Sequence, residues 1–141
     1  MTACLRHLAL RCHDLQRSRK FYEEVIGWKF VGWRPSGNSL DLTDGVLNIT
    51  LLQHNRQVER PRFEEGNEYI HFGIIVEDLA PIWRRLHDFG AEFSKDDVKE
   101  RNPIDVNQLP PRSFKVLDPD GNVVDITCNR GEWRGVTQVD G

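Results

Sequence analysis

The chain has 141 residues, which is enough for one domain that buries its own core. The net charge is −3 and charged residues make up 29% of the chain, so we expect neither disorder nor a basic surface for nucleic acid or membranes. No apolar run approaches the roughly 18 residues of a spanning helix, and the cysteines form no framework, so the expected location is cytoplasmic.

An internal repeat organises the sequence. Residues 7–15 return as 71–79, and the turn Asp44-Gly45 returns as Asp120-Gly121, each time before an apolar run. We therefore expect a single domain built from two copies of one module. Its parts would be module one over 4–54, a connector over 55–67, module two over 68–128 and a C-terminal tail over 129–141.

Module one reads as a strand, a helix and three more strands. Alternation over 4–12 predicts the first strand, Asp14 is placed to cap the helix, and Gly27 is placed to end it. Turn residues then separate three β-rich runs, at 28–33, 39–43 and 46–53.

Module two follows the same order. The first strand is expected over 69–76, and the helix runs between a cap at Asp78 and a stop at Gly90. Its remaining strands are expected at 91–94, 113–117 and 122–128. The stretch 95–112 holds three prolines and little periodicity, which is typical of a lid, a disordered segment or a docking loop.

Each predicted strand has one apolar face, and the opposite face carries polar residues near its middle. Those polar residues are His7, Asn48 or Thr50, His71 and Asp125. If the modules pair about a pseudo-twofold axis, His7, His71 and Asp125 converge. Two imidazoles and a carboxylate suit Fe, Mn or another divalent ion and leave positions open for substrate. The alternative is a polar cavity whose histidines only form hydrogen bonds.

Three stretches carry a family resemblance: Arg6-His7-Leu8-Ala9-Leu10, His71-Phe72-Gly73-Ile74 and the turn Asp118-Pro119-Asp120-Gly121-Asn122. They resemble the vicinal oxygen chelate superfamily of glyoxalases, bleomycin-resistance proteins, extradiol dioxygenases and fosfomycin-resistance enzymes. The resemblance implies an α+β fold, in which paired βαβββ modules form a curved mixed sheet, or cup, with helices on its outer face. It also implies a small-molecule substrate, a homodimer and a divalent metal (Fe, Mn, Zn or Ni) on His7, His71 and Asp125.

Two departures from the family pattern narrow the expected activity. The eighth-strand ligand is normally Glu, and the shorter Asp125 would draw the metal closer, bind it through water or leave the site empty. The fourth-strand Glu, a ligand and base in glyoxalases, is replaced by Thr50, or by Asn48 in a shifted register. Because Thr is no base near neutral pH, glyoxalase chemistry is disfavoured. Fosfomycin-resistance members carry Thr where this chain has Ala9, which disfavours that branch too.

The remaining pattern matches extradiol dioxygenases, so we expect a metal-dependent enzyme on a small oxygen-rich molecule. Ring cleavage is preferred over a metal-dependent lyase or transferase. Arg11 and Tyr69 are candidate substrate-binding residues, whereas His54 is expected at the surface. One alternative is a metal-free binding protein of the bleomycin-resistance type, with a stacking surface of Trp28, Trp33, Tyr69 and Phe114. Another is a relative that offers only an interaction surface.

Overall fold

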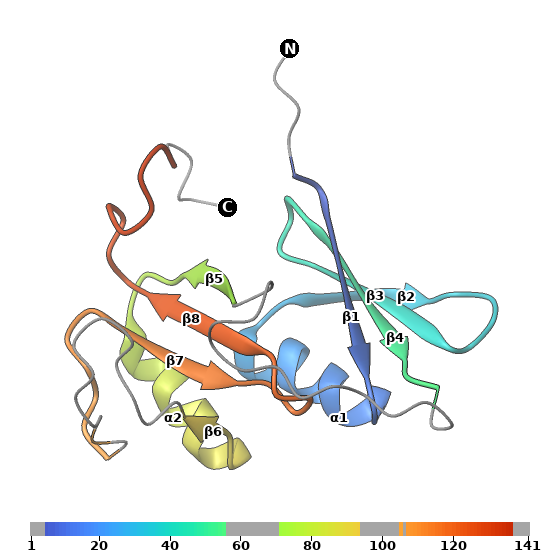
Figure 1. Cartoon of the computed structure of the whole chain (residues 1–141), viewed down its shortest axis with the longest axis horizontal. Coiled ribbons are helices and arrows are strands. Elements are labelled where there is room, and N and C mark those ends of the chain that lie inside the picture. The colour runs from blue at the N-terminus through green and yellow to red at the C-terminus, as the bar shows by residue number, and fades with distance from the viewer. Residues whose placement is uncertain (1–4, 56–70, 94–104, 106, 137–141) are drawn as a thin grey trace. The chain divides into compact units, whose positions relative to one another are not determined.

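The computed structural model describes residues 5–55, 71–93, 105 and 107–136. These residues fall into two compact units, one within 1–60 and one within 61–139. Each unit contains a strand, a helical segment and three strands in that order (Figure 1). The α+β class and the repeated βαβββ order predicted from the sequence are therefore confirmed.

The first unit is a four-stranded mixed sheet with one helical segment. Its strand order is β1-β4-β3-β2, with β1 parallel to β4 and the other pairs antiparallel. The side chain of Asp14 accepts a hydrogen bond from the Arg17 amide, as expected of a helix cap. Its elements are β1 (His7–Cys12), α1 (Leu15–Lys20), η1 (Phe21–Ile26), β2 (Lys29–Trp33), β3 (Ser39–Thr43) and β4 (Asn48–Gln53).

The helix of the first unit widens in its second half, which the sequence pattern did not predict. The carbonyl of Tyr22 accepts hydrogen bonds from the amides of Gly27 and Trp28, so η1 is a π-helical turn. Gly27 ends it in the left-handed conformation, at φ 95°. Six residues are too few turns for the spacing of apolar residues to distinguish a π-helix from an α-helix.

The second unit repeats this plan. Its strand order is β5-β8-β7-β6, with β5 parallel to β8. Asp78 caps the helix by accepting from the Ala80 amide, and Gly90 ends it at φ 78°. Residues 69–70 of the predicted first strand lie outside the described ranges. The elements are β5 (Phe72–Ile75), α2 (Leu79–Phe89), β6 (Glu92–Phe93), β7 (Ser113–Leu117) and β8 (Val123–Thr127).

The apolar faces of the strands pack against the helix to form the core of each unit. Burial of each large apolar side chain stabilises the folded state by roughly 1.5–3 kcal/mol. The fully buried side chains include Tyr22, Leu40, Leu42, Ile49 and Leu51 in one unit and Ile82, Leu86, Val116, Val124 and Ile126 in the other. The Trp28 ring stacks on buried Tyr22, with centroids 4.9 Å apart, and buried Phe114 meets Trp83 edge-on. Phe114 is therefore a core aromatic, and half-buried Trp28 packs against the core through Tyr22.

The turn between β7 and β8 is built around one buried carboxylate. One oxygen of Asp118 accepts from the amides of Asp120 and Asn122, at 2.9 and 2.7 Å. The other oxygen accepts from the Asn122 side chain at 2.8 Å. Gly121 supplies the positive φ of 82° that the turn requires. None of the helices in the described ranges is long and apolar enough to cross a membrane.

Candidate metal site and its surroundings

A histidine and a carboxylate face each other on the polar side of the second sheet. Gly73 of β5 lies opposite Asp125 of β8, and His71 precedes Gly73 by two residues, so their side chains share one face. His71 Nε2 lies 3.8 Å from Asp125 Oδ2, and the two side chains are 31% and 17% exposed. The sequence predicted both residues as ligands, and the structure brings them together.

The separation of this pair fits two ligands of one ion. Donor atoms about 2.1 Å from a shared metal are roughly 3.4 Å apart at a tetrahedral angle. The observed 3.8 Å is within about half an ångström of that value and is longer than a hydrogen bond. The shorter side chain of Asp125 thus still reaches the neighbourhood of the imidazole.

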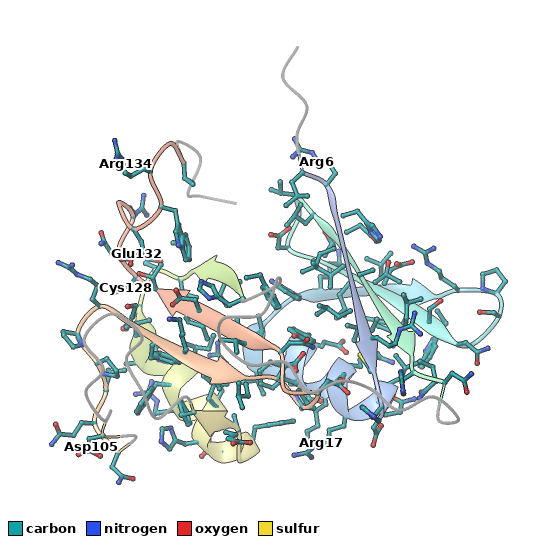
Figure 2. All side chains as sticks on the ribbon, in the orientation of Figure 1. Arg6, Arg17, Asp105, Cys128, Glu132 and Arg134 are labelled. Carbon is teal, nitrogen blue, oxygen red and sulfur yellow. The ribbon has the colours of Figure 1, made fainter. Side chains whose placement is uncertain are left out.

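An indole ring lies on the same face of the second sheet. Trp133, in the tail after β8, packs against the backbone of Gly73. Its sequence neighbours Glu132 and Arg134 are labelled in this tail in Figure 2. A methyl group on Gly73 would overlap this ring, with Cη2 only 2.5 Å away. Glycine at this position therefore lets the tail reach the strand beside His71 and Asp125.

In the first unit, His7 is hydrogen-bonded to its neighbour across the sheet. β1 and β4 pair in parallel with His7 opposite Asn48. His7 Nδ1 lies 2.7 Å from Asn48 Oδ1. Because an amide oxygen can only accept, Nδ1 carries the proton when this imidazole is neutral. Nε2 then holds a lone pair, as a metal ligand requires.

Behind Asn48, a carboxylate of β3 gathers three donors. Asp41 Oδ1 accepts from the Asn48 amide at 3.2 Å and from the Thr50 hydroxyl at 2.7 Å. Arg34 binds both carboxylate oxygens, through Nε and a terminal nitrogen, each at 3.0 Å. These bonds, above all those from Arg34, outweigh the opposing effect of burial and hold the pKa of Asp41 at about 2. The carboxylate is therefore ionised across the physiological range and is no proton acceptor there.

Both fourth-strand candidates belong to this network. Thr50 is only 2% exposed, and its hydroxyl accepts from Arg34 while it donates to Asp41. Asn48 is bound on its oxygen side by His7 and on its nitrogen side by Asp41. The position that carries a glutamate base in glyoxalases is thus filled by groups that do not take up protons near neutral pH.

The structure supports the expected position of Arg11, contradicts that of His54 and does not describe Tyr69. Arg11 is exposed on β1 and shares a face with His7, as expected. Tyr69, and residues 95–104 and 106 of the stretch 95–112, lie outside the described residues. His54 was expected at the surface and is 6% exposed, so that prediction is wrong. Its amide donates to the Cys12 carbonyl and its ring lies against His13, which tie it to the end of β1.

The three predicted ligands come from two units. Among the described residues of either unit, no group of three or more His, Cys, Asp or Glu side chains is arranged to hold a metal. The second unit supplies His71 and Asp125, and the first supplies His7. Joint coordination by all three stays a prediction.

Sequence reasoning missed Asp41, Arg34 and Trp133. Asp41 was detectable, because it alternates with buried Leu40 and Leu42 on β3 and so had to face the polar side. The signal for Trp133 was weaker. Gly73 is a single glycine inside an otherwise apolar strand, and such a glycine often marks the close approach of another group. Arg34 follows β2 in a loop, and its partner could not be read from spacing.

The chain is similar to known proteins along nearly its whole length. A glutathione transferase FosA of Serratia marcescens is 28% identical over 89% of this chain and 81% of the relative. A metallothiol transferase FosB of Bacillus licheniformis is 30% identical over 86% of this chain and 73% of the relative. A lactoylglutathione lyase of Neisseria meningitidis is 30% identical over 86% of this chain and 88% of the relative.

The fold is shared with solved structures as well. A fosfomycin resistance protein, FosX, from Mesorhizobium loti superposes with a TM-score of 0.65 at 17% identity, covering 92% of this chain and 94% of that one. The family model described as the Glyoxalase/Bleomycin resistance protein/Dioxygenase superfamily matches residues 5–126. The polar-faced βαβββ units, the relatives and this match agree, and the chain belongs to that superfamily.

Proposed function

We propose that the protein is a divalent-metal-dependent enzyme that acts on a small oxygen-rich molecule, with His7, His71 and Asp125 as its metal ligands. The observation that carries the proposal is the His71–Asp125 pair, whose donor atoms lie 3.8 Å apart on one face of the second sheet. His7 adds a second support, because its Nδ1 bond to Asn48 leaves Nε2 with the lone pair that ligation needs.

A bound divalent ion would supply Lewis-acid polarisation of substrate oxygens. The chain's own residues define what else the site can do. Asp41 is held ionised by Arg34, and Asn48 and Thr50 are not bases, so this face of the first sheet offers no carboxylate to take a proton from carbon. We propose Arg11, which is exposed on the face of His7, as the residue that binds an anionic substrate group.

These properties favour group transfer over isomerisation. In a transfer reaction the nucleophile forms a bond to a substrate carbon while a bond from that carbon to oxygen breaks, and the nucleophile's proton ends on the released oxygen. No C–H bond has to be deprotonated. The relatives named as glutathione transferase and metallothiol transferase, at 28% and 30% identity, support a thiol as the nucleophile. Ala9, where fosfomycin-resistance enzymes carry Thr, points to a different electrophile.

Ring-cleaving dioxygenation is the second candidate. It is favoured by the two-histidine, one-carboxylate set without a carboxylate ligand on the fourth strand, which is a donor pattern of non-haem Fe(II) oxygenases. Air-dependent turnover of a catechol with Fe(II), and none of a thiol, would select this candidate.

Metal titration of chelator-treated protein tests the shared part of the proposal. We expect one Mn²⁺, Zn²⁺, Ni²⁺ or Fe²⁺ to bind per chain by calorimetry, and His71→Ala and Asp125→Ala to abolish binding. His87→Ala is the matched control, because this histidine lies on α2 and bonds to the Trp83 carbonyl. Absence of binding at micromolar protein would overturn the proposal and favour a metal-free binding protein.

Two substrate assays separate the reaction classes. Loss of glutathione with a panel of small electrophiles that carry neighbouring oxygen atoms would identify a transferase, and oxygen uptake with catechols a dioxygenase. Activity that survives removal of metal would contradict both. The proposal includes a homodimer, which light scattering on the eluting protein tests.

A further inference from the structure

In the hydrogen-bond network around Asp41, each group's role as donor or acceptor is set by the group before it. The network begins at the Arg34 guanidinium, which binds Asp41 through two parallel hydrogen bonds at 3.0 Å. A guanidinium has no acceptor, so it can only donate. The paired carboxylate is left as an acceptor for every other group that reaches it.

Because the Asp41 carboxylate can only accept hydrogen bonds, it orients the side-chain amide of Asn48. The amide has a donor end and an acceptor end, and the end next to Asp41 lies 3.2 Å from Oδ1. Only the NH₂ group gains a hydrogen bond there, because an amide oxygen would face a carboxylate oxygen. The Thr50 hydroxyl has a single proton and donates it to Asp41 at 2.7 Å, so the orientation of Asn48 rests on Asp41 and not on Thr50, whose oxygen lies 3.0 Å from Asn48 Oδ1.

The orientation of Asn48 in turn decides which nitrogen of His7 carries the proton. With its NH₂ turned to Asp41, Asn48 presents Oδ1 to His7 Nδ1 at 2.7 Å. The neutral imidazole must then be the Nδ1–H tautomer, with its lone pair on Nε2. An isolated imidazole exchanges between both tautomers, so the network selects one of them.

We infer that Asn48, Asp41 and Arg34 are positioning residues that hold His7 in the Nδ1–H tautomer ready to bind a metal through Nε2. The inference rests on the proposed function, because it gives His7 the role of a ligand. It also gives Asn48, one of the two candidates for the fourth-strand site position beside Thr50, a role behind the ligand instead of on the ion. Outer partners of this kind contribute roughly 10–100-fold to metal affinity.

The tautomer can be measured without any metal. In metal-free protein with ¹⁵N-labelled histidine, at a pH where the imidazole is neutral, two-bond ¹H–¹⁵N correlations distinguish Nδ1–H from Nε2–H. We expect His7 of the wild-type protein to be Nδ1–H. A wild-type His7 that is Nε2–H, or an even mixture, would overturn the inference without the need for a variant.

Substitutions at Asn48 test the cause. Asn48→Leu removes the acceptor while keeping the same number of non-hydrogen atoms, so His7 should populate both tautomers and the affinity for Mn²⁺ or Zn²⁺ should fall roughly 10–100-fold. The double variant Asn48→Asp/Asp41→Asn exchanges the amide and the carboxylate, so it keeps an acceptor for Nδ1 and a donor opposite it, and it should retain the Nδ1–H tautomer as a rescue. Asp41→Asn frees the amide to turn over and should give a mixture. Gln53→Ala is the control, because it removes an amide from the same strand that binds the His13 carbonyl.

The outcomes separate this inference from the proposed function. An unchanged tautomer or an unchanged metal affinity in Asn48→Leu would overturn the inference, whatever the wild-type protein binds. A wild-type protein with the Nδ1–H tautomer that binds no metal would instead overturn the proposed function and remove the role given to His7 as a ligand. If Asn48→Leu does not fold, the wild-type tautomer, the Asp41→Asn variant and the Asn48→Asp/Asp41→Asn double variant still decide the matter.

Discussion

Lowering the pH should reduce the free energy of unfolding, because Asp41 becomes protonated. Its pKa lies at about 2 in the folded protein, against an ordinary 3.8, mainly because Arg34 hydrogen-bonds to the carboxylate. A group whose pKa is lowered by folding stabilises the folded state above its unfolded pKa and loses that contribution as pH falls through the folded one. The loss should therefore occur between about pH 4 and pH 2.

The size of the effect follows from the shift. A difference of nearly two pKa units corresponds to at most about 2.4 kcal/mol of unfolding free energy. The Arg34 side chain is 48% exposed and that of Asp41 is 18% exposed, so solvent screens the pair. We therefore expect a contribution of about 1 kcal/mol at neutral pH and low salt.

Urea unfolding of the wild-type protein and Asp41→Asn, from pH 7 to pH 2.5, measures this contribution. Other carboxyl groups titrate alike in both proteins, so the difference between the two unfolding free energies isolates Asp41. We expect this difference to shrink by about 1 kcal/mol between pH 5 and pH 2.5, and to vary less with pH in 1 M NaCl. A difference that stays constant over the whole pH range would refute the reasoning, as would an undiminished pH dependence in the Arg34→Gln background.

Two further substitutions test the second unit. Gly73→Ala should displace the Trp133 indole and lower the free energy of unfolding by about 1–3 kcal/mol, seen as changed tryptophan fluorescence and unfolding at lower urea concentration. The control Gly32→Ala, whose added methyl group meets nothing within 4 Å, should leave the fluorescence unchanged. Equal behaviour of the two variants would contradict the packing described. Asp118→Ala leaves three hydrogen-bond donors without an acceptor in a buried turn, so it should lower the free energy of unfolding by about 2–4 kcal/mol, measured by thermal unfolding. The control Asp44→Ala, in the exposed turn before β4, should cost less. The reverse order would count against this account.

Local signals in the sequence were sufficient for the fold. Strand alternation and the capping residues Asp14 and Asp78 depend on neighbours only a few positions away, so the order of elements and the polar faces could be predicted. The same alternation placed His71 and Asp125 on one face, and the register of β5 with β8 then set their separation.

The rest of the candidate site depends on partners that spacing does not reveal. Asp41 shares a face with Asn48, but its role comes from Arg34, which approaches from a loop. Whether an amide beside a histidine presents its oxygen or its nitrogen is decided by the third and fourth members of a network. The pairing of Gly73 with Trp133 likewise joins residues far apart along the chain, through the absence of a side chain.

The contact between Gly73 and Trp133 has a practical meaning for work with shortened or tagged forms of the protein. A form that stops before Trp133 keeps every helix and strand of the described ranges, so far-ultraviolet circular dichroism would report a folded molecule. It would nonetheless leave bare the part of β5 next to His71 that the indole normally covers. Inactivity of such a form would say nothing against the chemistry, and a bulky C-terminal fusion calls for the same care.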